Sequence, residues 1–488
     1  VRDFVDGKVR ASMFAAYLKE TLPSITAAST RARESLKLLQ DKSAEGDLWA
    51  KFFLARAHFH AAANAKEAQL RERFVGKGFP DTVRPYWDAY QTALRDPSFD
   101  GKFETAVTLA EEGAKKNFAP SVNVLGVMRL NGLGLPKDES HGLQLIRQAA
   151  DAGFSMAMLG LANAYANGQG IPKDLTQAHS WWRKASDLGQ ADAMYALAFS
   201  FADGHGVPKN QAEAVGWLRK AAELGHPASM SSLGDFYAAG HGVAKDELVA
   251  TQWYRKAAEA GETYAMVNLG WRYDNGRGVA KDEAQAVQWY RKAAEARDAD
   301  AMVNLGVAYA KGRGVTKDEA QAVQWNRKAA ELGHAGAMVN LGNLYAAGVG
   351  VAKDEAQATQ WYRKAADGGN ATAMFNLGNM YSSGRGITKD KAQAVQWYRK
   401  AAEAGYVDAM LNLGVAYDEG QGVTKDEAQA VQWYRKAAEA GQAGAMFNLG
   451  AAYSQGRGVT KDEAQSVQWY RKASELGHAR AMYMLGLD

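Results

Sequence analysis

Residues 264–299, YAMVNLGWRYDNGRGVAKDEAQAVQWYRKAAEARDA, form a unit of 36 residues that recurs with little change through most of the 488-residue chain. Self-similarity at a fixed period is the signature of stacked supersecondary units, and it outranks every local signal. A tryptophan occurs at every thirty-sixth position from Trp181 to Trp469. We therefore count ten full repeats between about residues 120 and 479.

The first part of the unit has the pattern of an amphipathic helix, which we name helix A. Its apolar residues recur at helical spacing and are Ala265, Met266, Leu269 and Tyr273. Gly276 and Gly278 then interrupt the pattern, because glycine tolerates the positive φ angles that a chain adopts as it leaves a helix and turns. Helix A is therefore predicted to end before this pair of glycines in every repeat.

A second helix, which we name helix B, follows the turn. Asp282 with Gln285 three residues later is a capping-box start. The apolar stripe of helix B consists of Ala286, Trp289, Tyr290 and Ala293. Most repeats close with a glycine after helix B, but Arg297 occupies that position in this repeat. We expect a locally strained or loosened junction at Arg297, which costs roughly 1 kcal/mol if this residue must adopt a left-handed conformation.

A single repeat cannot form a stable fold by itself. Burying one tryptophan gains only about 5 kcal/mol, whereas ordering one repeat costs on the order of 50 kcal/mol. Each pair of helices must therefore bury both faces against its neighbours, as stacked repeats do. The sequence predicts an all-α protein: a right-handed α/α superhelix, or solenoid, of ten 36-residue helical hairpins that follows a helical N-terminal region.

The pattern A-x-x-x-L-G-x-x-Y-x-x-G-x-G-V-x-K-D-x-x-x-A-x-x-W-Y-x-K-A-A resembles the Sel1-like repeat family, which is related to the tetratricopeptide repeats. The resemblance covers about residues 102–488 and rests on ten consecutive copies. It implies a protein-interaction scaffold, since members of the family mostly act as adaptors, exported bacterial proteins or toxin-neutralising partners. Four departures near the N-terminal end are conservative for packing: Ala162 and Ala198 replace the glycine of the Leu-Gly pair, Phe201 the tyrosine and Asn210 the aspartate.

Residues 1–101 do not show the period. Helices are expected in four stretches of this region: Arg10–Leu22, Thr30–Leu39, Asp47–Arg73 and Trp87–Leu94. The region is either a separate helical cap or domain, or a set of degenerate helical hairpins. We divide the chain accordingly into a helical N-terminal domain or cap (1–101) and a repeat solenoid (102–488).

Composition argues against several classes of protein. The formal net charge is only +4, with lysine and glutamate interleaved, so a nucleic-acid partner is not expected. No apolar run approaches the roughly 18 residues of a membrane-spanning helix. The absence of cysteine excludes disulfides and cysteine-bound zinc. No signal segment is visible, and the localisation is left open between the bacterial cytoplasm and the periplasm or an exported state.

No motif for catalysis, for a metal or for a cofactor is present. The repeated Gly-x-Gly pairs follow a helix and not a strand, which is typical of turns and not of phosphate-binding loops. His58 and His60 form the only close pair of histidines, and they point to different sides of a helix. We therefore expect no catalytic residue, no metal site and no cofactor.

The varied positions of helix A mark the expected binding site. They lie on one face, opposite the buried stripe, because of their helical spacing. In one repeat these positions are Tyr264, Val267, Trp271, Asp274 and Asn275. The position of Val267 carries Phe375, Phe447 and Tyr483 in other repeats. The resemblance implies that this face lines a concave groove, and a mixed apolar and aromatic groove suits an extended segment or a helix of another protein.

A ladder of identical asparagines lies next to this face. Its members are Asn268, Asn304, Asn340, Asn376, Asn412 and Asn448. Their amides either pair with the backbone of a bound peptide or tie neighbouring helices together. Identity across successive repeats favours the second interpretation, because identical groups cannot specify a sequence.

The leading functional hypothesis is a non-enzymatic scaffold or adaptor that grips a protein or peptide partner in the groove of helices A. The alternative is a bacterial immunity protein that neutralises a toxin, which predicts a neighbouring toxin gene and a tight one-to-one complex. A weaker alternative is an enzyme with its site in residues 1–101.

The last residues of the chain are expected to be poorly covered. The chain stops at Asp488, part-way into another helix A, and Tyr483, Met484 and Leu485 would have little packed over them. Because a solenoid end normally carries a polar cap, we expect either a shortened chain or a surface for self-association.

Overall fold

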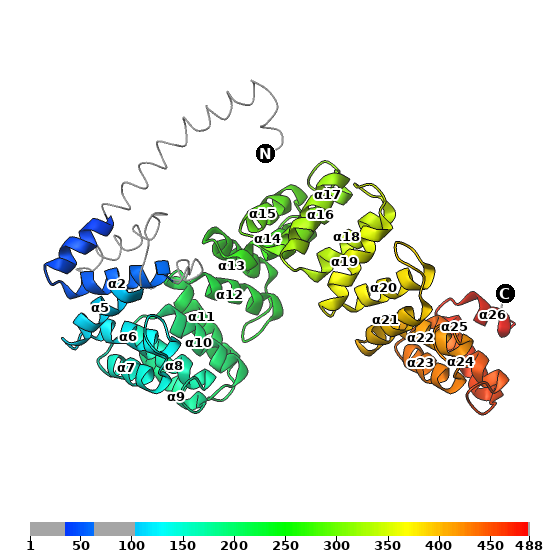
Figure 1. Cartoon of the computed structure of the whole chain (residues 1–488), viewed down its shortest axis with the longest axis horizontal. Coiled ribbons are helices and arrows are strands. Elements are labelled where there is room, and N and C mark those ends of the chain that lie inside the picture. The colour runs from blue at the N-terminus through cyan, green and yellow to red at the C-terminus, as the bar shows by residue number, and fades with distance from the viewer. Residues whose placement is uncertain (1–34, 63–102, 487–488) are drawn as a thin grey trace, which may run out of the picture. The chain divides into compact units, whose positions relative to one another are not determined.

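A computed structural model describes residues 35–62 and 103–486 of the chain, and every regular element in these ranges is an α-helix (Figure 1). The prediction of an all-α repeat solenoid is thereby confirmed. Residues 35–44 are helical, so they overlap the expected helix Thr30–Leu39 but extend five residues beyond its end, whereas α2 (Leu48–Ala62) falls within the expected helix Asp47–Arg73. The other two expected helices, Arg10–Leu22 and Trp87–Leu94, lie outside the described residues.

Each repeat contains one helix A and one helix B. The A helices are α6 (Ala119–Asn131), α8 (Ser155–Asn167), α10 (Ala191–Asp203), α12 (Pro227–Ala239), α14 (Thr263–Asn275), α16 (Ala299–Lys311), α18 (Ala335–Ala347), α20 (Ala371–Ser383), α22 (Val407–Glu419), α24 (Ala443–Gln455) and the short α26 (Ala479–Met484). The B helices are α5 (Phe103–Ala114), α7 (Glu139–Asp151), α9 (Leu175–Asp187), α11 (Gln211–Glu223), α13 (Glu247–Glu259), α15 (Glu283–Glu295), α17 (Glu319–Glu331), α19 (Glu355–Asp367), α21 (Lys391–Glu403), α23 (Glu427–Glu439) and α25 (Glu463–Glu475).

The helix boundaries follow from the capping residues seen in the sequence. The Asp282 carboxylate caps α15 by accepting a hydrogen bond from the backbone N–H of Gln285 at 2.9 Å. Asn210, which replaces the aspartate, caps α11 in the same way with Glu213 at 3.1 Å. Helix A ends at a left-handed glycine, such as Gly312 with φ 67°. The asparagine departure is therefore conservative for capping as well as for packing.

The second glycine of each turn makes a close contact between repeats. At Gly314, with φ 64°, a Cβ atom would overlap the carbonyl of Glu283, the first residue of α15. The first glycine of a turn thus ends helix A, and the second lets the turn lie directly on helix B of the preceding repeat.

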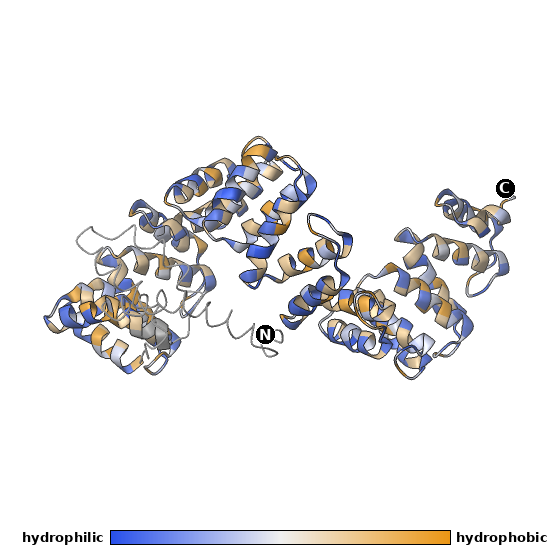
Figure 2. Ribbon diagram, turned by 90° about the horizontal axis from the view of Figure 1, so that it is seen from above, coloured by the Kyte–Doolittle hydropathy of each residue, from blue (hydrophilic) through white to orange (hydrophobic). Residues whose placement is uncertain are grey.

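The chain forms two compact units, residues 1–265 and 266–488, which divide within α14. In the first unit consecutive helices from α5 to α13 pack against each other, and in the second unit those from α15 to α26 do so. The B helices have a clear apolar face, whereas most A helices are apolar around more of their circumference; Figure 2 shows hydrophobic and hydrophilic residues together on most helices. Each helix therefore depends on its neighbours in the chain, as expected for a solenoid.

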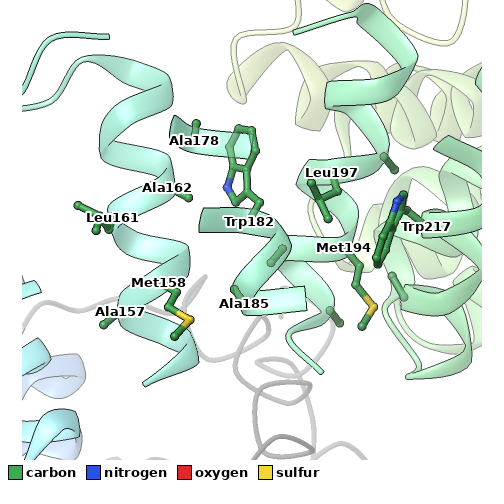
Figure 3. Packing of buried hydrophobic residues seen from close by; sticks show 14 of the residues in the cluster. Ala157, Met158, Leu161, Ala162, Ala178, Trp182, Ala185, Met194, Leu197 and Trp217 are labelled. Carbon is green, nitrogen blue, oxygen red and sulfur yellow. The ribbon is translucent and has the colours of Figure 1, made fainter. Parts of the chain in front are cut away.

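The core alternates small and large side chains. Between α8 and α11 the alanines let the helices approach closely, and Met158, Trp182, Leu197 and Trp217 fill the remaining space (Figure 3). The tryptophans that carry the period are mostly only half-buried, in contrast to Trp217. The expectation that Trp289 belongs to the buried stripe is thus only partly met: Ala286, Tyr290 and Ala293 are buried, and the Lys292 ammonium lies 4.0 Å from the centre of the half-buried Trp289 ring.

The start of the first unit is covered by α2. Phe52 and Phe53 of α2 are fully buried in a cluster with Ala106 of α5 and with Leu125 and Met128 of α6. The boundary between an N-terminal domain (1–101) and the solenoid (102–488) stays a prediction, since residues 63–102 are not described.

The junction expected to be strained has the predicted conformation. Arg297 has φ 67°, in the left-handed region where most other repeats carry glycine. Asn117, with φ 55°, occupies the same phase five repeats earlier and was not anticipated. Among the described helices, none is long and apolar enough to cross a membrane.

Candidate functional site on the A helices

The face of helix A predicted to bind a partner carries exposed aromatic residues. Tyr264 is 51 % exposed and Trp271 is 46 % exposed, both on α14, and Tyr483 on α26 is 80 % exposed. Single exposed apolar residues are common on protein surfaces, so the relevant feature is that Tyr264 and Trp271 lie seven residues apart on the same face of α14. Met484 is also exposed, while Leu485 is partly buried.

The position of Val267 is less open than the sequence suggests. Val267, Phe375 and Phe447 are half-buried, and Val339 is only 8 % exposed. The Phe375 ring lies 4.9 Å from the ring of Tyr406, the residue that begins the next helix A. These side chains therefore contribute to packing between repeats, and only part of each side chain is accessible to a partner.

The asparagine ladder is half-buried throughout: Asn268, Asn304, Asn340, Asn376, Asn412 and Asn448. The Asn340 amide donates a 3.1 Å hydrogen bond to the side-chain oxygen of Asn326 on α17. That contact joins helix B of one repeat to helix A of the next, as the tying interpretation predicts. Asn304 and Asn412 instead line the pockets described below.

The buried tyrosines of helix B reach this face through their hydroxyls. Tyr362 donates to Asn343 at 2.7 Å, and Tyr398 donates to Asn379 at 2.7 Å. Both acceptors occupy the position of Trp271, which the sequence analysis treated only as a variable surface position. The asparagines of this series face the tyrosine, and a tyrosine twenty residues after the glycine of the Leu-Gly pair, which occurs in six repeats, is the sequence signal for this contact.

A small pocket lies between helix A of one repeat and helix A of the next. In one copy, the Arg313 guanidinium forms an ion pair with Asp274 at 3.1 Å, and the space left beside Tyr290 and Asn304 is about 10 Å³. Burial raises the pKa of Tyr290 well above its ordinary value, and the Asp274 carboxylate raises it further. This copy of the pocket is closed by side chains of the protein itself.

The copy three repeats later is open. Ser382 and Gln421 stand where the first copy has Asp274 and Arg313, and the pocket has a volume of about 200 Å³. Lys391 lines it and donates a 3.0 Å hydrogen bond to the side-chain oxygen of Gln421. Val415 and Asn412, both on α22, complete the side that faces the predicted groove.

Hydrogen-bond donors surround the interior of the open pocket. Burial raises the pKa of Tyr398, while hydrogen bonds from Ser382 and Asn412 lower it. Those two side chains therefore lie beside the tyrosine hydroxyl. The pocket is thus polar inside and can hold a group that accepts hydrogen bonds.

A third copy contains the same ion pair that closes the first. Arg457 pairs with both carboxylate oxygens of Asp418, at 3.0 and 3.1 Å, next to Tyr434. Of these three equivalent sites, two contain an Asp–Arg pair between residues 39 positions apart, and the one with Ser382 and Gln421 at those positions has the open pocket.

Within residues 35–62 and 103–486, no group of three His, Asp or Glu side chains could hold a metal ion. The side chains of His58 and His60 are outside the described part of α2. His334, which the sequence placed at a repeat junction, caps α18 and lies 3.0 Å from Asp300 of the preceding helix A. The described face carries exposed aromatic residues and polar pockets.

Comparisons with known proteins agree with this architecture. The Sel1 repeat family model matches ten consecutive segments, from residues 119–154 to residues 443–478. A protective antigen present in uropathogenic Escherichia coli strains, which displays an SLR fold, is 31% identical with a TM-score of 0.57, over 91% of this chain and 88% of that chain. A Sel1 repeat protein from Oxalobacter formigenes is 33% identical with a TM-score of 0.53, over 62% of this chain and 88% of that chain.

An immunity protein from Pseudomonas aeruginosa is a more distant neighbour. It is 23% identical over 43% of this chain and 81% of that chain, with a TM-score of 0.31, so this likeness carries no argument about function. No curated protein matches the chain.

Proposed function

The chain belongs to the Sel1 repeat family, and on this premise we propose that it is a non-enzymatic scaffold that binds a partner protein along the exposed face of its A helices. Sel1 repeat proteins are typically protein-interaction scaffolds. The observation that carries the proposal is the contrast within the repeat: packing positions are kept, while the exposed positions of helix A vary. Packing accounts for the residues that are kept, and exposed aromatic residues such as Trp271 supply apolar area that a partner can cover.

Trp271 is the best candidate for an anchor. Its side chain is almost half exposed, and tryptophan is among the residues that most often dominate binding energy at protein interfaces. Phe375 and Phe447 offer smaller exposed areas on the same face of their own repeats. A partner that lies along several A helices would contact such residues one repeat after another.

The test begins with capture of partners from the native cell by the full-length chain, identified by mass spectrometry. Trp271→Ala, Phe375→Ala and Phe447→Ala are then compared with Leu248→Ala and Val467→Ala, which remove exposed apolar residues from B helices. We expect at least a tenfold loss of affinity from Trp271→Ala, which corresponds to about 1.4 kcal/mol. Equal effects of the A-helix and B-helix variants, with the fold intact by circular dichroism, would place the binding surface elsewhere.

The immunity-protein hypothesis makes a different prediction about the same surface. It requires one toxin, bound one-to-one, whose active site is covered by the complex. A captured partner that is an enzyme and loses its activity on binding favours this function; a partner that stays active contradicts it. The weaker hypothesis of an enzyme in residues 1–101 predicts activity in the full chain that substitutions in the A helices leave unchanged.

A further inference from the structure

The open pocket between α20, α21 and α22 differs from its copies in charge as well as in volume. The closed copies each contain a carboxylate of the protein, Asp274 or Asp418, paired with an arginine. In the open copy both members of the pair are replaced by uncharged residues, Ser382 and Gln421. The interior has therefore lost its own carboxylate while keeping the tyrosine and the asparagine beside it.

The mouth of the open pocket carries a positive charge where most other copies carry a negative one. Helix B begins with glutamate in seven repeats, where it forms ion pairs with the lysine two residues earlier, such as Lys281–Glu283 at 2.8 Å and Lys425–Glu427 at 2.8 Å. At the start of α21 the same position is Lys391, so the pair becomes two lysines, Lys389 and Lys391. A reversal of charge at one copy of an otherwise repeated ion pair is not explained by packing.

Two acidic residues close to Lys391 or to its partner Gln421 in the chain, Asp390 and Glu419, already accept hydrogen bonds. The Asp390 carboxylate caps α21 by accepting from the backbone of Gln393 at 2.9 Å. Glu419 accepts a hydrogen bond from the Gln421 amide. The ammonium of Lys391 itself is bonded to a neutral oxygen, that of Gln421. A negatively charged group that enters the pocket would thus find a cation without an opposite charge in direct contact.

We propose that this pocket receives the carboxylate of an aspartate or glutamate side chain from the bound partner. The carboxylate takes the place that Asp274 and Asp418 fill in the closed copies, with Lys391 as its counter-ion and with Ser382 and Asn412 as hydrogen-bond donors. Charge-assisted hydrogen bonds of this kind are stronger than neutral ones. The inference rests on the proposed function, since Asn412 and Val415 belong to the same face of helix A, and it adds the chemical class of one partner residue.

The direct test uses a small probe and the full-length chain. Methyl-labelled protein is titrated with N-acetyl-glutamate-N-methylamide, and the NMR signals of Val395 and Val415, which line the pocket, are followed. We expect these signals to shift with the glutamate probe and not with the glutamine analogue. Equal shifts with the glutamine analogue, or shifts with inorganic phosphate but not with the glutamate probe, overturn the proposal.

Two variants taken from the chain's own repeats sharpen the test. Lys391→Glu restores the residue found at the start of most B helices, and Ser382→Asp with Gln421→Arg restores the pair that closes the other copies. Both keep the fold because the same combinations occur in neighbouring repeats. We expect each to weaken binding of the glutamate probe at least tenfold, and unchanged binding in Lys391→Glu overturns the assignment.

The outcomes separate this inference from the proposed function. The probe tests the pocket without any partner, whereas the Trp271→Ala comparison tests the surface with one. Loss of partner binding in Trp271→Ala together with no response to the glutamate probe retains the scaffold and rejects the carboxylate site. A response to the probe without any effect of Trp271→Ala rejects the proposed binding surface and retains the pocket.

Discussion

The glycine of the recurring Leu-Gly pair is required by a side chain twenty residues later. A Cβ atom at Gly378 would lie 2.6 Å from the ring of Tyr398 on the next helix. Where helix A carries alanine instead, at Ala162 and Ala198, the position on helix B is not tyrosine but Trp182 and Leu218. The departures that the sequence analysis regarded as merely conservative therefore occur together with a change in the residue that they face.

Gly378→Ala is expected to destabilise the protein by roughly 1–3 kcal/mol, because the added methyl group must displace a buried ring. The matched control is Gly160→Ala in α8, where a Cβ would make only an ordinary contact 3.7 Å from Ile146. That change should stabilise by about 0.5–1 kcal/mol, since it removes a glycine from a helix interior. Urea unfolding measures both, and the same sign for the two variants would contradict the explanation.

Arg297→Gly is expected to raise the free energy of unfolding by about 1 kcal/mol, because glycine adopts φ 67° without the steric cost that arginine carries. The control is Gly333→Arg one repeat later, where φ is 90°. This reverse change should destabilise by at least a similar amount. If Arg297→Gly lowers the stability instead, then the arginine side chain makes a contact that outweighs the backbone strain.

The left-handed junctions show how far residue-level prediction extends. The conformation of Arg297 could be predicted because the equivalent position in most other repeats is glycine, the residue typical of a left-handed backbone. The same comparison could have identified Asn117, but the period is weak at that end of the chain. The contact between Gly378 and Tyr398 could not be predicted, because the repeat period gives the position of a residue along its helix and not its contacts with the next helix.

At the scale of helices, neighbouring repeats are joined by polar contacts that the hydrophobic pattern does not reveal. The arginine of one helix B donates to a tyrosine hydroxyl on the next helix A, as in Arg291–Tyr309 at 3.2 Å and Arg435–Tyr453 at 2.8 Å. A lysine of helix B also lies over the tryptophan three residues earlier in every repeat from Trp181 to Trp469. These residues therefore recur at the same position of each repeat because of contacts at the surface as well as because of burial.

The buried tyrosines of helix B should make stability depend on alkaline pH. Burial and nearby carboxylates raise the pKa of Tyr290 and of Tyr434 above the ordinary value. Above about pH 10 the unfolded chain therefore loses phenol protons that the folded chain keeps. Below this pH the tyrosines make their whole contribution to the free energy of unfolding, and this contribution falls as the pH rises towards the pKa of the folded state.

Urea unfolding between pH 8 and pH 11.5 tests this expectation. Tyr434→Phe should show a shallower loss of stability with pH than the unchanged protein, because one of the titrating groups is removed. The exposed Tyr483→Phe serves as the control and should leave the slope unchanged. Identical slopes for Tyr434→Phe and the unchanged protein would mean that the Tyr434 hydroxyl ionises as readily in the folded state as in the unfolded one.

The helices themselves were predictable, but the candidate site was only partly so. Capping residues and turn glycines define the ends of α15 and its relatives from sequence alone. The exposed face with Tyr264 and Trp271 followed from helical spacing. The pocket did not, because the pairing of Asp274 with Arg313 across 39 residues depends on how one repeat is rotated against the next, and helical spacing says nothing about that rotation.

At the scale of the whole chain, stability is expected to be local. In each unit a helix packs mainly against the helices next to it in sequence, so the interaction energy is approximately a sum over neighbouring repeats. The cluster in which α2 meets α5 and α6 closes the first unit at its start. A defect there should therefore disturb the adjacent repeats and fade along the array.

Phe53→Ala tests this locality. Phe53 is fully buried in α2, and removal of a buried phenylalanine typically costs about 3–5 kcal/mol. We expect faster amide hydrogen exchange in α5 and α6, which pack directly against this side chain, and unchanged exchange in α24 and α25. Leu38→Ala, which truncates an exposed residue of the same region, is the control and should change neither.

The pattern of exchange distinguishes two physical descriptions of the array. If Phe53→Ala accelerates exchange equally from α5 to α25, the chain unfolds as one cooperative body and the interfaces between repeats are stronger than the repeats themselves. If the effect ends within a few helices, each hairpin can open while its distant relatives stay folded. The second result would also explain how single repeats can change their exposed residues, such as Lys391, without loss of the fold, because each substitution would affect only its own neighbourhood.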